Sequence, residues 1–241
     1  MELKIFQKGF NFSQDGPGNR LVYHLFGCNM HCPWCSNPEG MGCGGEYYTA
    51  SPEQITEEAL SCKAMFFENG GVTFTGGECT LQADPLAETL KGLKNKDIST
   101  AVETNGTYKS FFKLIPLLDY IIMDFKHPDS DKHRKITGIS NQIIKENIML
   151  ASNSGKELLI RIPLINGFNT DEKTIEKFLE FFQTLNKDNT RIELLKYHEY
   201  GKDKWKKCGL EYTVKDGFVS EEIRINFENK IEDIGHKTVR T

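Results

Sequence analysis

Six short apolar runs alternate with amphipathic segments along most of this chain, and this alternation limits the fold more than any other feature. The runs are rich in β-branched and aromatic residues, and their nearly continuous apolar character is typical of strands covered on both faces. They lie at residues 20–26, 71–76, 99–105, 120–125, 157–164 and 191–198. Strands that alternate with helices form a parallel sheet, so the sequence predicts an α/β fold.

Helical periodicity fills the gaps between these runs, at residues 53–69, 84–95, 109–118, 141–153, 171–186 and 219–234. Ser51 before Pro52, and Thr170 before an acidic first turn, are the predicted helix N-caps. About six βα units predict a partial, TIM-like (β/α)6 barrel. We expect one domain over residues 1–241, with its working face at the C-terminal ends of the strands.

Charge and hydropathy exclude several classes of partner. The chain has 30 basic and 34 acidic residues, a net charge of -4, so no strong field attracts nucleic acid or an anionic membrane. The N-terminal segment lacks an apolar stretch of signal-peptide length, and no later segment approaches the roughly 18 uninterrupted apolar residues that span a bilayer. We therefore expect a cytoplasmic monomer that binds neither nucleic acid nor membrane.

Three of the seven cysteines directly follow the first predicted strand with the spacing C-x3-C-x2-C, at Cys28, Cys32 and Cys35. An odd number of cysteines without an export signal favours reduced thiols that act as ligands. A structural zinc site in a binding module needs four ligands, and Cys43 or His31 could complete the set. Three thiolates alone suit a [4Fe-4S] cluster with one iron left open. The zinc and cluster interpretations predict a colourless and a brown protein, respectively.

Small or polar residues stand at the ends of the later predicted strands as well. A Gly-Gly pair at a strand end lets the backbone approach a ligand closely, although a tight turn would also use it. Asp124 and Lys126 share one side of the fourth strand, where a structural ion pair is the alternative to a ligand contact. The residues that converge on the working face are Gly76, Gly77, Glu78, Glu103, Asn105, Asp124, Lys126, Arg161 and His198.

The cysteine loop resembles the hallmark of the radical S-adenosylmethionine (SAM) superfamily, C-x3-C-x-aromatic-C, with Trp34 at the aromatic position. The resemblance implies that Cys28, Cys32 and Cys35 hold a catalytic [4Fe-4S] cluster, that its open iron binds SAM, and that Trp34 contacts the adenine. In this superfamily an electron from the reduced cluster cleaves SAM into methionine and a 5′-deoxyadenosyl radical, which abstracts hydrogen.

Further motifs, spread over nearly the whole chain, resemble the glycyl radical enzyme activating enzymes. They are DGPGNR (15–20), GGVTFTGGE, ETNG, MDFK, HRKITGISN (133–141), RIPLINGFN and LLKYHEYGKDKW (194–205). The resemblance implies a polypeptide substrate, the glycine loop of a glycyl radical enzyme that loses a Cα hydrogen, with pyruvate formate-lyase as the first choice. It also implies flavodoxin or ferredoxin as the electron donor.

The same resemblance assigns roles to the residues at the strand ends. Gly76, Gly77 and Glu78 would meet the methionine end of SAM, and the other residues implied in cofactor binding are Asn105, Asp124, Lys126, Arg161 and His198. Glu103, Thr104 and Asp124 match positions around a monovalent cation. The family has Asp where this chain has Glu103, and the longer side chain weakens that assignment.

Only residues 36–52 separate the cysteine motif from the next predicted helix, and they include one cysteine, Cys43. They cannot supply a ferredoxin-like insert, so we expect a single cluster. Cys62, Cys79 and Cys208 lack ligand spacing and are interpreted as buried or incidental thiols. A small-molecule radical SAM enzyme, such as a deazaguanine-forming type, is the alternative function, and the segment at 194–205 favours the activating enzyme.

Overall fold

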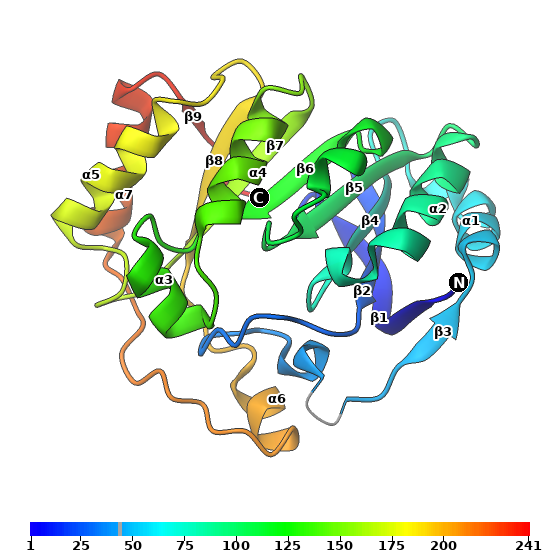
Figure 1. Cartoon of the computed structure of the whole chain (residues 1–241), viewed down its shortest axis with the longest axis horizontal. Coiled ribbons are helices and arrows are strands. Elements are labelled where there is room, and N and C mark those ends of the chain that lie inside the picture. Colours follow the sequence, from blue (N-terminus) through cyan, green and yellow to red (C-terminus); the bar gives the residue numbers. More distant parts are fainter. Residues whose placement is uncertain (43–44) are drawn as a thin grey trace.

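The computed structural model describes residues 1–42 and 45–241, so Cys43, considered above as a ligand, lies outside the described residues. The chain forms a curved nine-stranded sheet with the strand order β3-β1-β2-β4-β5-β6-β7-β8-β9 (Figure 1). The strands are β1 (Leu3–Phe12), β2 (Asn19–Leu25), β3 (Tyr48–Ala50), β4 (Gly71–Gly76), β5 (Ser99–Thr104), β6 (Tyr120–Asp124), β7 (Glu157–Leu164), β8 (Thr190–Lys196) and β9 (Lys237–Thr238).

In the order β2-β4-β5-β6-β7-β8-β9, each strand pairs in parallel with the next. Strands β1 and β3 add an antiparallel edge beside β2. The six predicted strands are all present, as β2 and β4 to β8, and the predicted α/β partial barrel is confirmed. The strands β1, β3 and β9 were not predicted. The described strands form an open sheet, because the edge made by β1 and β3 does not pair with the opposite edge, β9.

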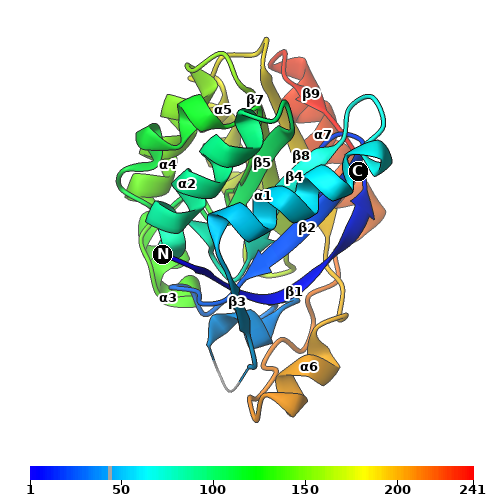
Figure 2. The same cartoon turned by 90° about the vertical axis from the view of Figure 1, so that its right-hand side faces the viewer.

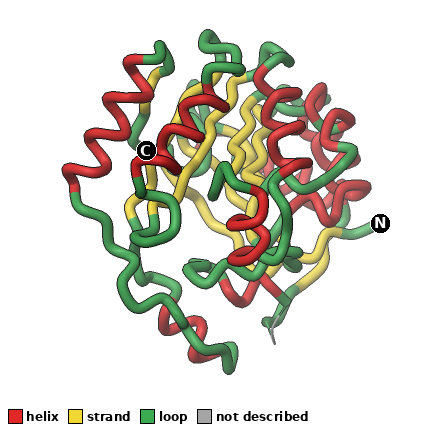
Figure 3. Tube along the Cα trace, turned by 60° about the vertical axis from the view of Figure 1, so that its left-hand side comes forward, coloured by secondary structure: helices red, strands yellow, loops and turns green. Residues whose placement is uncertain are grey.

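The outer face of the sheet is covered by α1 (Pro52–Ser61), α2 (Ala83–Lys94), α3 (Ser130–Thr137), α4 (Gln142–Ser152), α5 (Glu172–Phe182) and α7 (Glu221–Asp233) (Figures 1 and 2). Helix α6 (Lys202–Lys207) lies apart from the sheet, beside the 3-10 turn Pro38–Met41. Figure 3 shows the same layering, with helices outside the strands. No helix among the described residues is both long enough and apolar enough to cross a bilayer.

The core lies between the sheet and these helices. In α5, Ile175, Phe178 and Phe182 recur on one face with helical spacing and are fully buried or nearly so. Phe178 meets Phe125, which follows β6, edge to face with ring centroids 5.3 Å apart. Phe227 of α7 packs on the Phe178 ring, with the centroids 5.6 Å apart. Each buried phenylalanine contributes about 2 kcal/mol by leaving water.

The predicted helix over 109–118 is wrong. Two short 3-10 turns, Phe111–Lys113 and Ile115–Leu117, occupy this segment. Pro116 has no backbone N–H, and its ring would clash with the carbonyl four residues earlier in an α-helix. The segment therefore turns tightly and buries Phe111 without forming a helix.

One predicted N-cap is confirmed and one is displaced by a residue. Ser51 accepts a hydrogen bond from Gln54 N at 3.3 Å, and Gln54 Oε1 accepts one from Ser51 N at 2.8 Å, which forms a capping box. At the start of α5 the cap is Asp171, not Thr170, because the Asp171 carboxylate accepts from Thr174 N at 3.1 Å. The helix expected over 53–69 ends at Ser61.

Candidate active site

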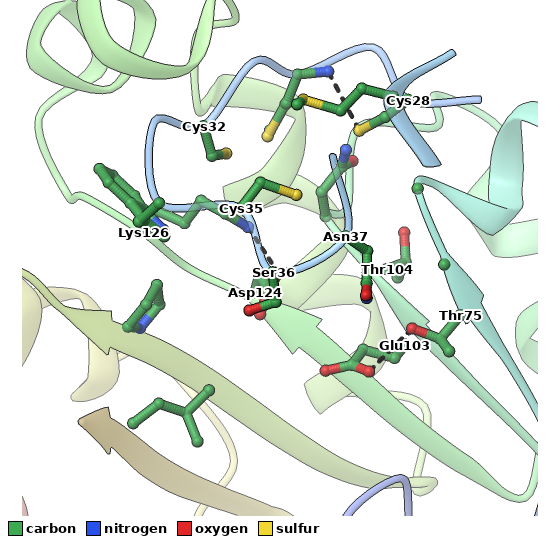
Figure 4. A pocket seen from close by; sticks show the side chains of 18 of the residues that line it. Cys28, Cys32, Cys35, Ser36, Asn37, Thr75, Glu103, Thr104, Asp124 and Lys126 are labelled. Carbon is green, nitrogen blue, oxygen red and sulfur yellow. Dashed lines mark hydrogen bonds and ion pairs between the residues drawn. The ribbon is translucent and has the colours of Figure 1, made fainter. Parts of the chain in front are cut away.

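A pocket of about 230 Å³ opens at the C-terminal ends of the parallel strands. The loop after β2 and the ends of β4, β5, β6 and β8 line it (Figure 4). We call it the upper pocket. It brings together most of the residues that the sequence indicated: Cys28, Cys32, Trp34, Cys35, Gly76, Gly77, Glu103, Thr104, Asn105, Asp124, Lys126 and His198. Glu78 and Arg161 do not line it.

The three cysteines lie on one loop, residues 26–37, which begins where β2 ends. Met30 N donates to Cys28 Sγ at 3.4 Å, and Cys35 N donates to the Cys32 carbonyl at 3.1 Å. Burial raises the pKa of Cys28 to about 11 and that of Cys35 to about 12, and it also raises the pKa of Cys32. The thiols therefore stay protonated at neutral pH unless a metal group compensates the thiolate charge.

The glycine pair at the end of β4 lets the cysteine loop approach closely. Gly76 has a φ of +119°, and a Cβ there would lie 2.3 Å from Leu25 N. A Cβ on Gly77 would lie 2.2 Å from the Gly27 carbonyl oxygen, so no other residue fits at either position. Gly77 N donates to the Leu25 carbonyl at 2.9 Å. The glycines thus line the upper pocket and also tie β4 to the cysteine loop.

Glu78 is buried behind this pocket. Its carboxylate accepts hydrogen bonds from Thr104 Oγ1 at 2.6 Å and Asn105 N at 2.6 Å, and from Thr80 N at 2.9 Å. Burial raises the pKa of Glu78 even though these donors oppose the shift. The side chain therefore joins the ends of β4 and β5 and does not reach the cavity in which the sequence placed it.

Asp124 and Lys126 lie at the end of β6 and form an ion pair, with Lys126 Nζ 2.6 Å from Asp124 Oδ2. Burial alone would lower the pKa of Lys126, but attraction to Asp124 outweighs it and raises the pKa. Lys126 therefore remains charged although its side chain is only 8% exposed. It provides a fixed positive charge in the wall of the upper pocket.

Two further residues line the upper pocket: Trp34, on the cysteine loop, and Asn105, directly after β5. The Trp34 ring lies against Phe168, with centroids 5.0 Å apart and planes tilted by 48°. Asn105 Nδ2 donates to Asn29 Oδ1 at 2.9 Å, so the residue after β5 is also bonded to the cysteine loop. Both positions agree with the predicted placement at the working face.

Arg161 lies deeper, between two carboxylates. Its Nη1 is 2.6 Å from Glu103 Oε1, and its Nε is 2.8 Å from Glu193 Oε2. Nη2 donates to the Gln14 carbonyl and to Thr241 Oγ1, the latter at 3.1 Å. Although burial opposes it, attraction to the two carboxylates raises the pKa of Arg161. The guanidinium is bonded within the protein on every nitrogen.

The three residues considered for a monovalent cation all have other partners. Glu103 pairs with Arg161 and accepts from Thr75 Oγ1 at 3.0 Å (Figure 4), Thr104 donates to Glu78, and Asp124 pairs with Lys126.

The remaining cysteines lie elsewhere. Cys79 is fully buried, donates to the Glu103 carbonyl at 3.4 Å, and has a pKa that burial raises well above the usual value. Cys62 directly follows α1 and Cys208 directly follows α6, and neither lines the upper pocket. Their interpretation as buried or incidental thiols stays a prediction.

A contact that the sequence did not reveal fixes the cysteine loop from outside. Trp205 of α6 is buried, and its Nε1 donates to the Cys35 carbonyl at 2.8 Å. Lys204 Nζ lies 2.8 Å from both Glu39 Oε1 and Asn37 Oδ1. The signal was a tryptophan inside a run of lysines, which marks one buried position on an otherwise solvated helix.

Comparison with known proteins gives the family. The Radical SAM superfamily model matches residues 22–182, about two thirds of the chain. The chain belongs to the radical SAM superfamily. Members carry a [4Fe-4S] cluster and use SAM, and the three-cysteine loop of this radical SAM enzyme falls inside the matched region.

Several curated relatives are activating enzymes. The pyruvate formate-lyase-activating enzyme of Streptococcus mutans is 33% identical over 212 residues, which cover 84% of this chain and 80% of that protein. The 4-hydroxyphenylacetate decarboxylase activating enzyme of Clostridioides difficile is 30% identical and aligned over 93% of each chain. This radical SAM enzyme is therefore an oxidoreductase of the activating-enzyme type.

Solved structures with a similar fold include an activating enzyme as well. A domain of the pyruvate-formate lyase-activating enzyme from Bacteroides vulgatus is 31% identical, with a TM-score of 0.59 over 70% of this chain and 98% of that one. A radical SAM methyltransferase from Sphaerobacter thermophilus, 15% identical, matches 96% of this chain and 72% of that one with a TM-score of 0.67. The second match shows the shared fold alone.

Proposed function

We propose that this radical SAM enzyme activates a glycyl radical enzyme, and that pyruvate formate-lyase is the first partner to test. One observation carries the proposal: three thiols, a glycine backbone and a buried lysine from separate strand ends face one pocket. About 30% identity over most of the chain to enzymes named for this activity supports it, including one from Escherichia coli aligned over 93% of each chain.

Cys28, Cys32 and Cys35 are proposed to hold the cluster. The donor set fits, because thiolates are the ligands of iron–sulfur clusters and the three thiols line one cavity from one loop. When bound, the cluster supplies the electron that cleaves SAM, and SAM supplies the species that removes a hydrogen atom from a glycine Cα of the partner. The remaining residues of the pocket are proposed to bind and orient SAM.

The proposed contacts to SAM follow from charge and shape. Lys126 stays protonated and offers its charge to the SAM carboxylate, while Gly76 and Gly77 leave room for the methionine end. Trp34 offers an aromatic face to the adenine, and His198 after β8 and Asn105 after β5 offer polar atoms. Arg161 and Glu78 position other residues in this proposal and do not touch SAM, because neither lines the upper pocket.

We propose one cluster. The aligned 297 positions of the Clostridioides difficile relative exceed the 241 residues of this chain, so that relative carries residues absent here, whereas the Streptococcus mutans relative aligns over 212. A monovalent cation beside Glu103, Thr104 and Asp124 stays a prediction. A flavodoxin or ferredoxin is the proposed electron donor.

The test is an electron paramagnetic resonance (EPR) spectrum. The reconstituted, reduced enzyme is mixed anaerobically with SAM and pyruvate formate-lyase in its non-radical form. We expect a persistent organic doublet on the partner that requires SAM. Formation of 5′-deoxyadenosine without a protein radical, with pyruvate formate-lyase and with other glycyl radical enzymes, would favour the small-molecule alternative.

A further inference from the structure

A second cavity, of about 530 Å³, lies beside the upper pocket. We call it the lower cavity. Its walls include the β1 residues Gln7, Gly9 and Asn11 on one side and His198 and Tyr200, which follow β8, on the other. The residues that line both cavities are Ser36, Asn37, Thr75, Glu103, Leu195 and His198. The lower cavity therefore leads from the β1 side of the barrel to the upper pocket.

Gly9 stands in the middle of β1, and nothing within this chain explains it. Its φ is not positive, and a Cβ built there would meet no atom within 4 Å. Glycine in a strand interior loses more conformational entropy on folding than other residues and has no side chain to pack. Such a glycine often marks a place where a ligand or another backbone approaches closely. Gly9 lines the lower cavity, so the approach is from that side.

The β1 edge leaves an entrance. Residues 7–12 of β1 pair with β2, whereas β3 covers only Leu3–Ile5 on the other side. In the part of the chain that the structure describes, no strand pairs with that other side of β1 beyond Ile5. The lower cavity thus lies next to the open edge of the sheet, where a polypeptide can enter from outside.

The walls suit a neutral polypeptide backbone. Gln7 and Asn11 flank Gly9 on the same face and are about 13 Å apart along an extended strand, the length of a four-residue segment. The Gln7 amide can both donate and accept, whereas Asn11, whose Nδ2 donates to Gln14 and Asp15, offers its Oδ1 as an acceptor for a peptide N–H. In the wall, the single cation of Arg161 stands against the two carboxylates of Glu103 and Glu193, and Asp15 adds another carboxylate. The wall is therefore net acidic, which disfavours acidic side chains in a bound segment.

We propose that an extended segment of the partner protein, without acidic side chains, crosses the inner face of β1 at Gly9, with Gln7 and Asn11 bonding its backbone. The next residues of that segment reach the upper pocket past Thr75 and Asn37. This inference rests on the proposed function and adds to it the surface that reads the partner. Gly9 is then a specificity-determining residue, not a catalytic one.

The test is Gly9→Val. Valine is favoured in strands, and its Cβ would meet no atom of this chain within 4 Å, so the fold should tolerate it. We expect a rise of at least about tenfold in the KM for pyruvate formate-lyase, and weaker binding of that protein to the SAM-loaded enzyme in surface plasmon resonance. SAM cleavage with dithionite and no partner should stay within about twofold of wild type. Gly9→Ala should give a smaller rise in KM.

The matched control is Phe12→Val, on the opposite face of the same strand and 67% exposed. It should leave both the KM and the affinity unchanged. If Gly9→Val activates and binds the partner like wild type, or if it loses SAM cleavage without partner, the inference is wrong. A wild-type enzyme that forms no radical on any glycyl radical enzyme overturns the proposed function, and this inference with it.

Discussion

The upper pocket and the lower cavity share a wall, but their polar side chains differ in how fully they are bonded within the protein. In the upper pocket, the three thiols face the space, and Lys126, paired with Asp124 alone, also lines it. In the lower cavity, Arg161 is bonded on every nitrogen to Glu103, Glu193 and neighbouring groups. The thiols mark where chemistry is proposed, whereas Arg161 ties β7 to the carboxylates of β5 and β8 and holds the sheet together beside the surface proposed for recognition.

The largest effect is expected in the upper pocket. Cys32→Ser removes a proposed ligand, so SAM cleavage should fall by more than about 100-fold and the brown colour should be lost or weakened. Absorbance and 5′-deoxyadenosine formation measure this. Cys62→Ser, at the far end of α1, is the matched control and should behave as wild type. Equal activity in both variants would remove the cysteine loop from the mechanism.

Arg161→Met should act on stability and spare SAM binding. It leaves two carboxylates without their cation, one of them, Glu193, only 3% exposed, and breaking such a pair costs about 3–5 kcal/mol. Chemical denaturation measures the free energy of unfolding, with Arg191→Met as control. A variant of unchanged stability with a raised KM for SAM would show that Arg161 contacts the cofactor and that the two regions differ less than we infer.

Trp205→Phe tests how firmly α6 holds the cysteine loop. Phenylalanine keeps an aromatic ring but cannot donate to the Cys35 carbonyl, and a buried acceptor without its donor costs about 1–3 kcal/mol. We expect iron to be lost to a chelator about five- to tenfold faster. Tyr200→Phe, at a residue 83% exposed, should release iron at the wild-type rate. Equal rates in the two variants would mean that the indole bond does not hold the loop.

The smallest effect concerns pH. Burial lowers the pKa of His133 in α3 to about 4, against about 6.5 in an unfolded chain. Below pH 6.5 the unfolded state binds more protons, so stability falls as the pH falls. Between pH 7 and 5.5 the loss should be about 1 kcal/mol. His133→Gln should show a pH dependence weaker by that amount in chemical denaturation, and an unchanged dependence would count against the buried neutral imidazole.

The sequence predicted the parallel strands well, because each is a nearly continuous apolar run that only a strand covered on both faces explains. It did not predict β1, since residues such as Gln7 and Lys8 interrupt the apolar pattern of an edge strand. It also misread residues 109–118, where Pro116 prevents the helix that the surrounding apolar spacing favours.

The sequence predicted where most of the site residues lie, but not which side chains they bond to. Strand ends place the cysteines, Asp124 and Lys126 on one face, and the pocket there contains them. The pairing of Arg161 with Glu193 joins different strands, and the bonds of Glu78 to Thr104 and Asn105 join others. Spacing along one chain cannot show such contacts, so both residues were expected in the pocket and instead support it.

The central claim is that three cysteines hold one cluster whose remaining iron binds SAM. The most direct measurement is an EPR titration of the reduced, reconstituted protein with SAM, together with iron and zinc analysis. The account predicts about four irons per chain, a single cluster signal, and a shift of its g values as SAM binds. A protein that holds zinc instead, or a cluster signal that SAM leaves unchanged, would contradict it.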